Sequence, residues 1–283
     1  MKNSISPPDL AGVIDLHIHC APDVMPRSMD GLEVAALAGG MGMRAIVLKN
    51  HFEHTASLAS LARKHTPAVE TFGSIALNRP VGGINPAAVE HMTGILGGFG
   101  RIVWMPTFEA ENHVRRAGSG RPFVSVARDG RLLPEVFEVL ELVAKHNLVF
   151  ATGHSSPGEA LLLIREARKL GIQKVIATHA IADPVFMNTA ETMEAAALGA
   201  FVEFTCLELS GPKLATSAKQ HAEAIRKIGV ERCILSSDLG QSVNPPAPRG
   251  LLSFIGQLAR EGFSELDLHL MTKRNPARII GLE

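Results

Sequence analysis

Short runs of β-branched and other apolar residues recur along the chain, and longer segments of mixed apolar and polar residues separate them. A short apolar run bounded by turn residues is typical of a buried strand, whereas apolar residues at every third or fourth position are typical of a surface helix. We expect eight strands, near residues 12–18, 44–49, 69–76, 101–106, 148–153, 174–179, 200–205 and 232–237. We expect helices over residues 30–38, 55–65, 86–96, 134–146, 157–170, 184–198, 214–228 and 248–261.

Turn residues mark the ends of several of these helices. Proline follows a polar residue at three predicted starts, and glycine follows three predicted ends, as helix termini favour. The pairs are Asn85-Pro86, Ser156-Pro157 and Asp183-Pro184, and the glycines are Gly171, Gly199 and Gly229. One connection, residues 107–133, is long, and long loops are usually functional or mobile. Because it follows the fourth strand, we expect it to overhang the active face.

Strict alternation of strands and helices predicts an α/β fold in which helices cover a parallel sheet. Eight such units close a (β/α)8 barrel of the TIM type, a fold of about 250 residues. The chain has 283 residues and no segment that resembles a linker, so we expect a single domain over residues 1–283.

Histidine or aspartate closes five of the predicted strands, at the ends that a parallel barrel gathers on one face. These residues are His17, His19, His51, His154, His179 and Asp238. Any one of them could be a structural residue held by hydrogen bonds. His17 and His19, however, are two positions apart on one strand and therefore project on the same side. Together the residues predict a site for one or two divalent ions, zinc first, with iron or manganese as alternatives.

The ordered set of motifs resembles the amidohydrolase superfamily of metal-dependent hydrolases over essentially the whole chain. It comprises Asp15-Leu16-His17-Ile18-His19, His154, His179, Asp238 and the tail segment Asn275-Pro276-Ala277. The resemblance implies a metal-bearing barrel that hydrolyses an ester, amide, lactone or C–N bond. We expect the substrate itself to be small and anionic. The resemblance also implies that Asp238 takes the proton from a metal-activated water and returns it to the leaving group.

The chain departs from that pattern at two strands. Two-metal members carry a bridging carboxylated lysine or a glutamate at the fourth strand, whereas here only Glu109 lies nearby. Lys49 and His51 instead close the second strand, which resembles the second motif of the PHP phosphoesterases. A PHP-like phosphoesterase and a metal-binding barrel without catalysis therefore stay as alternatives. Lys49 can be a carbamate bridge, a substrate contact or half of a buried ion pair, and we favour the contact.

Five further residues are candidates for substrate contact because they follow strands on the same face. They are Arg27, Asn78, Arg79, His113 and Glu203. An arginine in such a loop can grip a carboxylate with two hydrogen bonds, although it can equally be solvated. Glu203 is either a site carboxylate or half of a pair across the barrel.

Composition limits the class of partner. Lys and Arg together number 28, as do Asp and Glu, and no run of like charge marks a surface for nucleic acid or membrane. The first residues lack the apolar core of a signal peptide, and no apolar stretch is long enough to span a bilayer. We expect a cytoplasmic protein with a small-molecule substrate, and a homo-oligomer is compatible with the sequence. Three cysteines without paired spacing make no disulfide framework.

Overall fold

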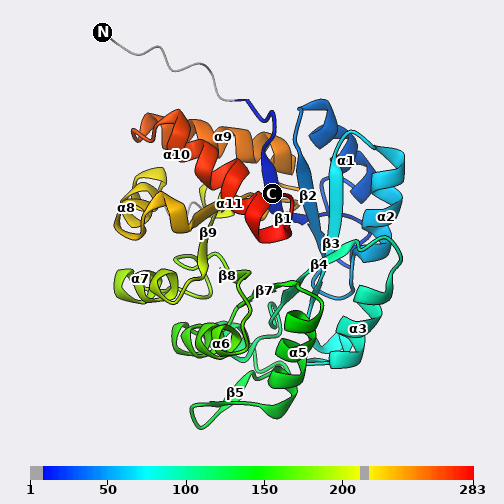
Figure 1. Ribbon diagram of the computed structural model, residues 1–283, viewed down its shortest axis with the longest axis vertical. Helices are drawn as coiled ribbons and strands as arrows, with labels where there is room; N and C mark the ends of the chain where they lie inside the picture. Colours follow the sequence, from blue (N-terminus) through cyan, green and yellow to red (C-terminus); the bar gives the residue numbers. More distant parts are fainter. Residues whose placement is uncertain (1–8, 211–216) are drawn as a thin grey trace.

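Eight parallel strands form one sheet that closes into a barrel in the computed structural model, which describes residues 9–210 and 217–283 (Figure 1). The strands follow one another around the barrel in chain order. They are β1 (Ile14–His19), β2 (Ala45–Lys49), β3 (Glu70–Ala76), β4 (Gly100–Trp104), β7 (Val149–Ala151), β8 (Val175–Ala177), β9 (Phe201–Thr205) and β10 (Cys233–Ser236). The predicted (β/α)8 barrel is confirmed.

The barrel closes where the chain after β10 meets β1. The amide of Asp238 donates a hydrogen bond of 2.8 Å to the carbonyl of His17. The amide of His19 donates one of 2.8 Å to the carbonyl of Leu239. The seam therefore places the two histidines of β1 beside Asp238, although the two segments lie at opposite ends of the sequence.

Helices surround the barrel, and several begin at the capping boxes that their sequences encode. They are α1 (Gly31–Gly40), α2 (Ala56–His65), α3 (Pro86–Gly94), α5 (Pro134–Lys145), α6 (Pro157–Lys169), α7 (Thr189–Ala197), α8 (Ala218–Ile228) and α9 (Ala247–Arg260). Ser156 with Glu159 caps α6, and Ser217 with Gln220 caps α8. Such reciprocal hydrogen bonds satisfy amides that the first turn would otherwise leave without acceptors.

The last elements close the barrel at the end where the strands begin. They are α10 (Glu265–His269), a π-helical turn (Leu270–Arg274) and α11 (Asn275–Ile280). The Asn275 side chain donates hydrogen bonds to the carbonyls of Val230 and Cys233, at the start of β10. Ile279 and Ile280 pack into the barrel's own core together with Ile14. This tail therefore seals the N-terminal face and leaves the opposite face to the strand ends.

Three predicted segments differ from the structure. The helix expected over 184–198 begins only at Thr189, because Asn188 and Glu191 form its capping box while residues 180–187 make hydrogen-bonded turns. The helix expected over 214–228 begins at Ala218, and residues 214–216 lie outside the described residues. The long connection 107–133 holds a short helix, α4 (Glu111–Arg116), and a hairpin of β5 (Ala127–Arg128) and β6 (Arg131–Leu132).

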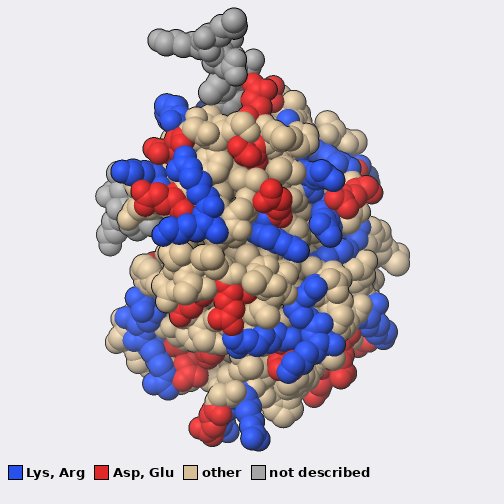
Figure 2. Space-filling model, turned by 60° about the vertical axis from the view of Figure 1, so that its left-hand side comes forward, with Lys and Arg blue, Asp and Glu red and all other residues tan. Residues whose placement is uncertain are grey.

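The surface fits the balanced composition. Figure 2 shows basic and acidic side chains interspersed over the side that lies to the left in Figure 1, where α6, α7 and α8 are labelled. Across residues 9–210 and 217–283, no helix has the length and apolar character needed to cross a membrane.

Gly240 is required at the closing seam. Its φ is +143°, and a Cβ at this position would lie 1.9 Å from the carbonyl oxygen of His19. We expect Gly240→Ala to lower the free energy of unfolding by about 2 kcal/mol or more, because neither backbone can yield without breaking the seam. Gly158→Ala in α6 is the matched control, since no atom lies within 4 Å of its Cβ. Urea unfolding should show a gain of about 0.4–1 kcal/mol for this control, and equal effects of the two substitutions would contradict the assignment.

Candidate metal centre

Five imidazole rings form a closed circuit at the C-terminal ends of the barrel strands. The ring centroids of His17 and His19 are 5.4 Å apart, those of His19 and His51 4.5 Å, and those of His51 and His154 6.3 Å. The centroids of His154 and His179 are 4.9 Å apart, and 6.2 Å separates His179 from His17. All five side chains are buried. The barrel therefore brings together histidines that lie up to 162 residues apart (179 − 17 = 162).

Three residues offer ligand atoms close enough to share one ion. Asp238 Oδ1 lies 2.9 Å from His17 Nε2 and 3.1 Å from His19 Nε2. Ligand atoms of these three residues all lie within 4.8 Å of one another, and they form the single such group found among residues 9–210 and 217–283. Two imidazole nitrogens and a carboxylate oxygen are the donors of a typical catalytic zinc site, which leaves a further position for water. The donor set therefore fits a divalent transition metal.

The orientation of His17 is fixed by Glu203 on β9. His17 Nδ1 lies 3.3 Å from both carboxylate oxygens of Glu203, and Glu203 also accepts a hydrogen bond of 3.1 Å from the amide of His179. A carboxylate on the far nitrogen holds a ligating imidazole in position and turns its other nitrogen toward the metal. Glu203 is therefore paired across the barrel, one of the two roles expected for it.

Lys49 stands next to the three ligands. Its Nζ lies 2.8 Å from His17 Nε2 and 4.2 Å from the centre of the Trp104 ring, and its side chain is buried. Burial lowers the pKa of Lys49 to about 8, although Asp238 and Glu203 act in the opposite direction. With this pKa the ammonium of Lys49 stays mostly charged at neutral pH, so it can bind an anion, and it releases its proton more readily than an exposed lysine does.

The surrounding histidines are kept neutral. Burial lowers the pKa of His19 to about 3 and that of His179 to about 4. It also lowers the pKa values of His51 and His154 well below the ordinary value. A neutral imidazole keeps the lone pair that a metal requires. His179 Nδ1 is buried and has no hydrogen-bond partner among the described residues, so a bound ion or water would satisfy it.

His17 and Asp238 form a charged pair at the centre of the site. Burial lowers the pKa of His17, but the carboxylates of Asp238 and Glu203 outweigh it and raise the value to about 9. Burial would raise the pKa of Asp238, yet His17 and the hydrogen bonds from His17 and His19 hold it well below the ordinary value. The carboxylate is therefore ionised and pairs with the protonated His17, and a metal ion bound there would take the place of the imidazole proton.

Residues 12–203 match a family described as "Family of unknown function (DUF6282)". The chain belongs to this family. The match includes His17, His19, Lys49 and Glu203, whereas Asp238 lies beyond it. No curated protein sequence matches the chain.

Several solved structures share the fold of this DUF6282 chain. An amidohydrolase from Pseudomonas aeruginosa superposes with a TM-score of 0.65 and 15% identity, over 95% of each chain. Organophosphorus hydrolase from Deinococcus radiodurans gives 0.62 and 15%, over 99% of this chain and 100% of that one. 2,6-Dihydroxybenzoate decarboxylase from Rhizobium gives 0.61 and 14%, over 96% and 99%. The resemblance to the amidohydrolase superfamily is thus confirmed at the level of the fold.

Two predicted contact residues of the DUF6282 chain lie in the wall of the site. Arg27 is ion-paired with Asp23 at 2.6 Å, and its guanidinium lies 3.5 Å from His19 Nδ1. His113, on α4, is half-buried, and its Nδ1 lies 2.8 Å from Nδ1 of His154. Each of the two side chains contacts a histidine of the circuit, and substrate contact by either stays a prediction.

The other two predicted contacts lie beneath the site and on its rim. The buried Asn78 amide donates to the carbonyl of His51 and to Thr107 Oγ1, and its oxygen accepts from the amide of Thr107. Asn78 thus ties the ends of β3 and β4 to the chain after β2. Arg79 is exposed, and its backbone amide donates to the carboxylate of Glu109, the only acid expected near the fourth strand.

Sequence reasoning missed the aromatic residues that line the site. Trp104 packs against His17 with ring centroids 4.6 Å apart, and Phe108 stacks on His51 at 3.8 Å. Thr107 Oγ1 also lies 2.8 Å from His51 Nδ1 and fixes that ring. The available signal was their place at the end of the fourth strand, where Trp104 is the one tryptophan of the chain.

Proposed function

We propose that this protein is a metal-dependent hydrolase acting on a small, anionic substrate with an ester, amide, lactone or related C–N bond. The observation that carries the proposal is the group of His17, His19 and Asp238, whose ligand atoms lie within 4.8 Å of one another at the barrel mouth. Zinc is the first choice of metal for these donors, with iron or manganese as alternatives. His51, His154 and His179 are the candidates for holding a second ion.

Each residue of the centre has a definite part in the proposed reaction. A bound divalent ion would supply a water whose pKa is lowered toward about 7 and would polarise the substrate carbonyl. Asp238 is an ionised carboxylate beside that position, so it can accept the proton of the attacking water and pass it to the leaving group. Glu203 holds His17 in place. Lys49 offers a cation for an anionic group of the substrate.

The proposal is tested by a panel of carboxylic esters, lactones and amides, assayed before and after chelation and again after zinc, iron or manganese is returned. We expect at least one of these substrates to be cleaved, the activity to disappear with the metal, and the activity to return with it. The panel also contains phosphomonoesters, which are assayed for hydrolysis, and 2,6-dihydroxybenzoate, which is assayed for decarboxylation. Cleavage of phosphomonoesters alone would favour the PHP-like alternative, and decarboxylation alone would replace hydrolysis by another reaction of this fold.

The role of Lys49 can be separated from that of a metal bridge. We expect Lys49→Met to reduce kcat/KM by about 100-fold, the lower range for a positioned polar group, while metal stoichiometry is unchanged. Metal content and steady-state rates are measured on the same sample. Lys273→Met, on the opposite face of the barrel, is the control. Loss of one of two metals, with partial recovery of rate on addition of short carboxylic acids, would contradict the contact role and favour a carbamate bridge.

A further inference from the structure

A pocket lies at the end of the barrel opposite the candidate metal centre, where β8, β9 and β10 begin. Its volume is about 220 Å³, and four of the eight residues that line it are basic: Arg168, Lys174, Arg232 and Arg278. The other lining residues are Gln173, Gly199, Phe201 and Ile279, so no carboxylate lines this part of the described structure. We refer to these four basic residues as the basal cluster.

Backbone carbonyls hold three members of the basal cluster in place. Arg168 donates a hydrogen bond of 3.1 Å to the carbonyl of Ile172, and Lys174 donates one of 3.1 Å to the carbonyl of Asn147. Arg232 donates to the carbonyl of Gly199 at 3.3 Å, and its guanidinium lies 5.5 Å from the centre of the Phe201 ring. Carbonyls orient the cations but leave their charges uncompensated. The pocket therefore holds several cationic side chains in fixed positions before any ligand binds.

The four members of the basal cluster lie together without an acidic partner. Arg63 pairs with Glu70 and Arg165 with Glu194, whereas none of the four cluster members has a carboxylate within 4.0 Å among residues 9–210 and 217–283. Burial and the nearby Arg101 lower the pKa of Lys174. Arg101 Nε is itself buried without a hydrogen-bond partner among the described residues. Like charges held together in this way repel one another, and an anion between them would relieve that repulsion.

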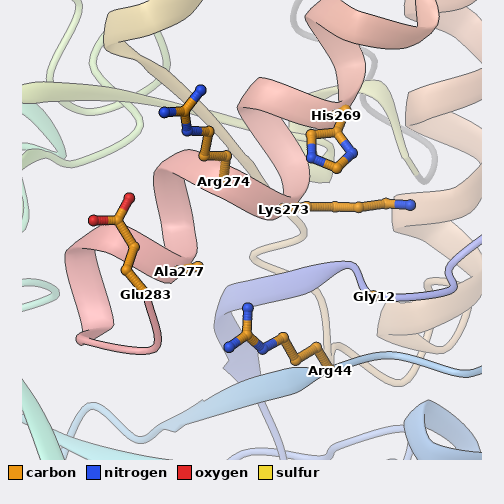
Figure 3. A pocket seen from close by; sticks show the side chains of 7 residues that line it. All are labelled: Gly12, Arg44, His269, Lys273, Arg274, Ala277 and Glu283. Atoms are coloured by element: carbon orange, nitrogen blue, oxygen red, sulfur yellow. The ribbon is translucent and has the colours of Figure 1, made fainter.

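A neighbouring pocket on the same face shows the contrast. Figure 3 shows Arg44 and Arg274 in that pocket together with the carboxylate of Glu283. Its basic side chains therefore have an acidic group within the same pocket, and the charge there is mixed. The basal cluster has no such group in its lining.

We propose that the basal cluster is a binding site for the phosphate group of a small metabolite. Three guanidinium groups and one ammonium match the several oxygens of a tetrahedral anion, and the arginine fork binds such oxygens in pairs. A pocket of about 220 Å³ is smaller than the roughly 300–1,000 Å³ typical of sites for drug-sized ligands, so it suits a small anion. Because it lies at the barrel end opposite the candidate metal centre, this site is separate from the proposed hydrolysis.

Calorimetric titration of the full-length protein with inorganic phosphate tests the proposal, with acetate at equal ionic strength as the comparison anion. We expect phosphate to bind with a dissociation constant of about 1 mM or below and acetate to bind at least about 10-fold more weakly. Arg278→Gln and Arg168→Gln should each weaken phosphate binding about 10-fold, the scale of a lost charged hydrogen bond. Arg278 is exposed on α11, so its replacement should leave the fold intact.

Two controls decide where the phosphate binds. Arg274→Gln removes an exposed cation just before α11 that does not line the pocket, and we expect it to leave the affinity unchanged. His17→Ala with His19→Ala removes the candidate metal ligands, and phosphate binding should persist. The proposal is overturned if acetate binds as well as phosphate or if both cluster variants retain full affinity. Loss of binding in the double histidine variant would also overturn it.

Discussion

Asp238→Asn is expected to lower kcat by about 100-fold or more while KM changes little. Asparagine has nearly the same shape, so the backbone bond from residue 238 to the His17 carbonyl can persist. The amide cannot accept the proton that the carboxylate would take from the attacking water. Positioned acid–base groups contribute about 10²–10⁴-fold to rates, which sets the expected scale. Steady-state kinetics on the first substrate found in the panel measure the effect.

Asp129→Asn is the matched control for this substitution. Asp129 is exposed in the turn between β5 and β6 with a φ of 49°, a conformation that asparagine tolerates well. The kcat of the Asp129→Asn variant should equal that of the unsubstituted protein. Metal content is measured on each sample, because Asp238 is also a candidate ligand. Full activity of Asp238→Asn at full metal content would remove Asp238 from the mechanism.

His17→Ala with His19→Ala is expected to remove the bound metal and to abolish metal-dependent activity. The two imidazoles supply two of the three ligand atoms in the group, so one carboxylate would be left to hold an ion. Loss of even an outer hydrogen-bond partner costs about 10–100-fold in metal affinity, and loss of two direct ligands should cost more. Elemental analysis after dialysis against metal-free buffer gives the stoichiometry.

A second pair of histidines provides the control. The rings of His54 and His91 lie 5.3 Å apart, with His54 half-buried and His91 exposed, and neither belongs to the circuit at the barrel mouth. His54→Ala with His91→Ala should keep the full metal content. Equal metal content in both double variants would place any bound metal elsewhere in the protein.

The fold could be predicted because its signals are local. Each strand is a short apolar run, and each run predicted from the sequence corresponds to a strand of the barrel, such as β1 and β10. The start of α7 was wrong by five residues (189 − 184 = 5), because Asp183-Pro184 resembles a helix start whereas Asn188 with Glu191 provides the actual cap. The Asp-Pro pair and the capping box both indicate a helix start in this segment, and the helix begins at the capping box.

The site was predictable only as far as the fold implies which strand ends meet. His17, His19 and Asp238 could be grouped because a closed barrel places its first and last strands side by side. The contact of Lys49 with His17 and the pairing of His17 with Glu203 depend on side-chain packing across the barrel. These pairs are 32 and 186 residues apart, and no local pattern encodes them. The catalytic and substrate-binding roles stay predictions.

Anomalous X-ray scattering from crystals of the purified protein, recorded at the zinc, iron and manganese absorption edges, tests the central claim most directly. We predict a metal peak at the barrel mouth, bonded to the imidazoles of His17 and His19 at about 2.0–2.1 Å and to Asp238 at about 2.0–2.2 Å. Crystals soaked in zinc that show no peak within bonding distance of these three residues would contradict the account.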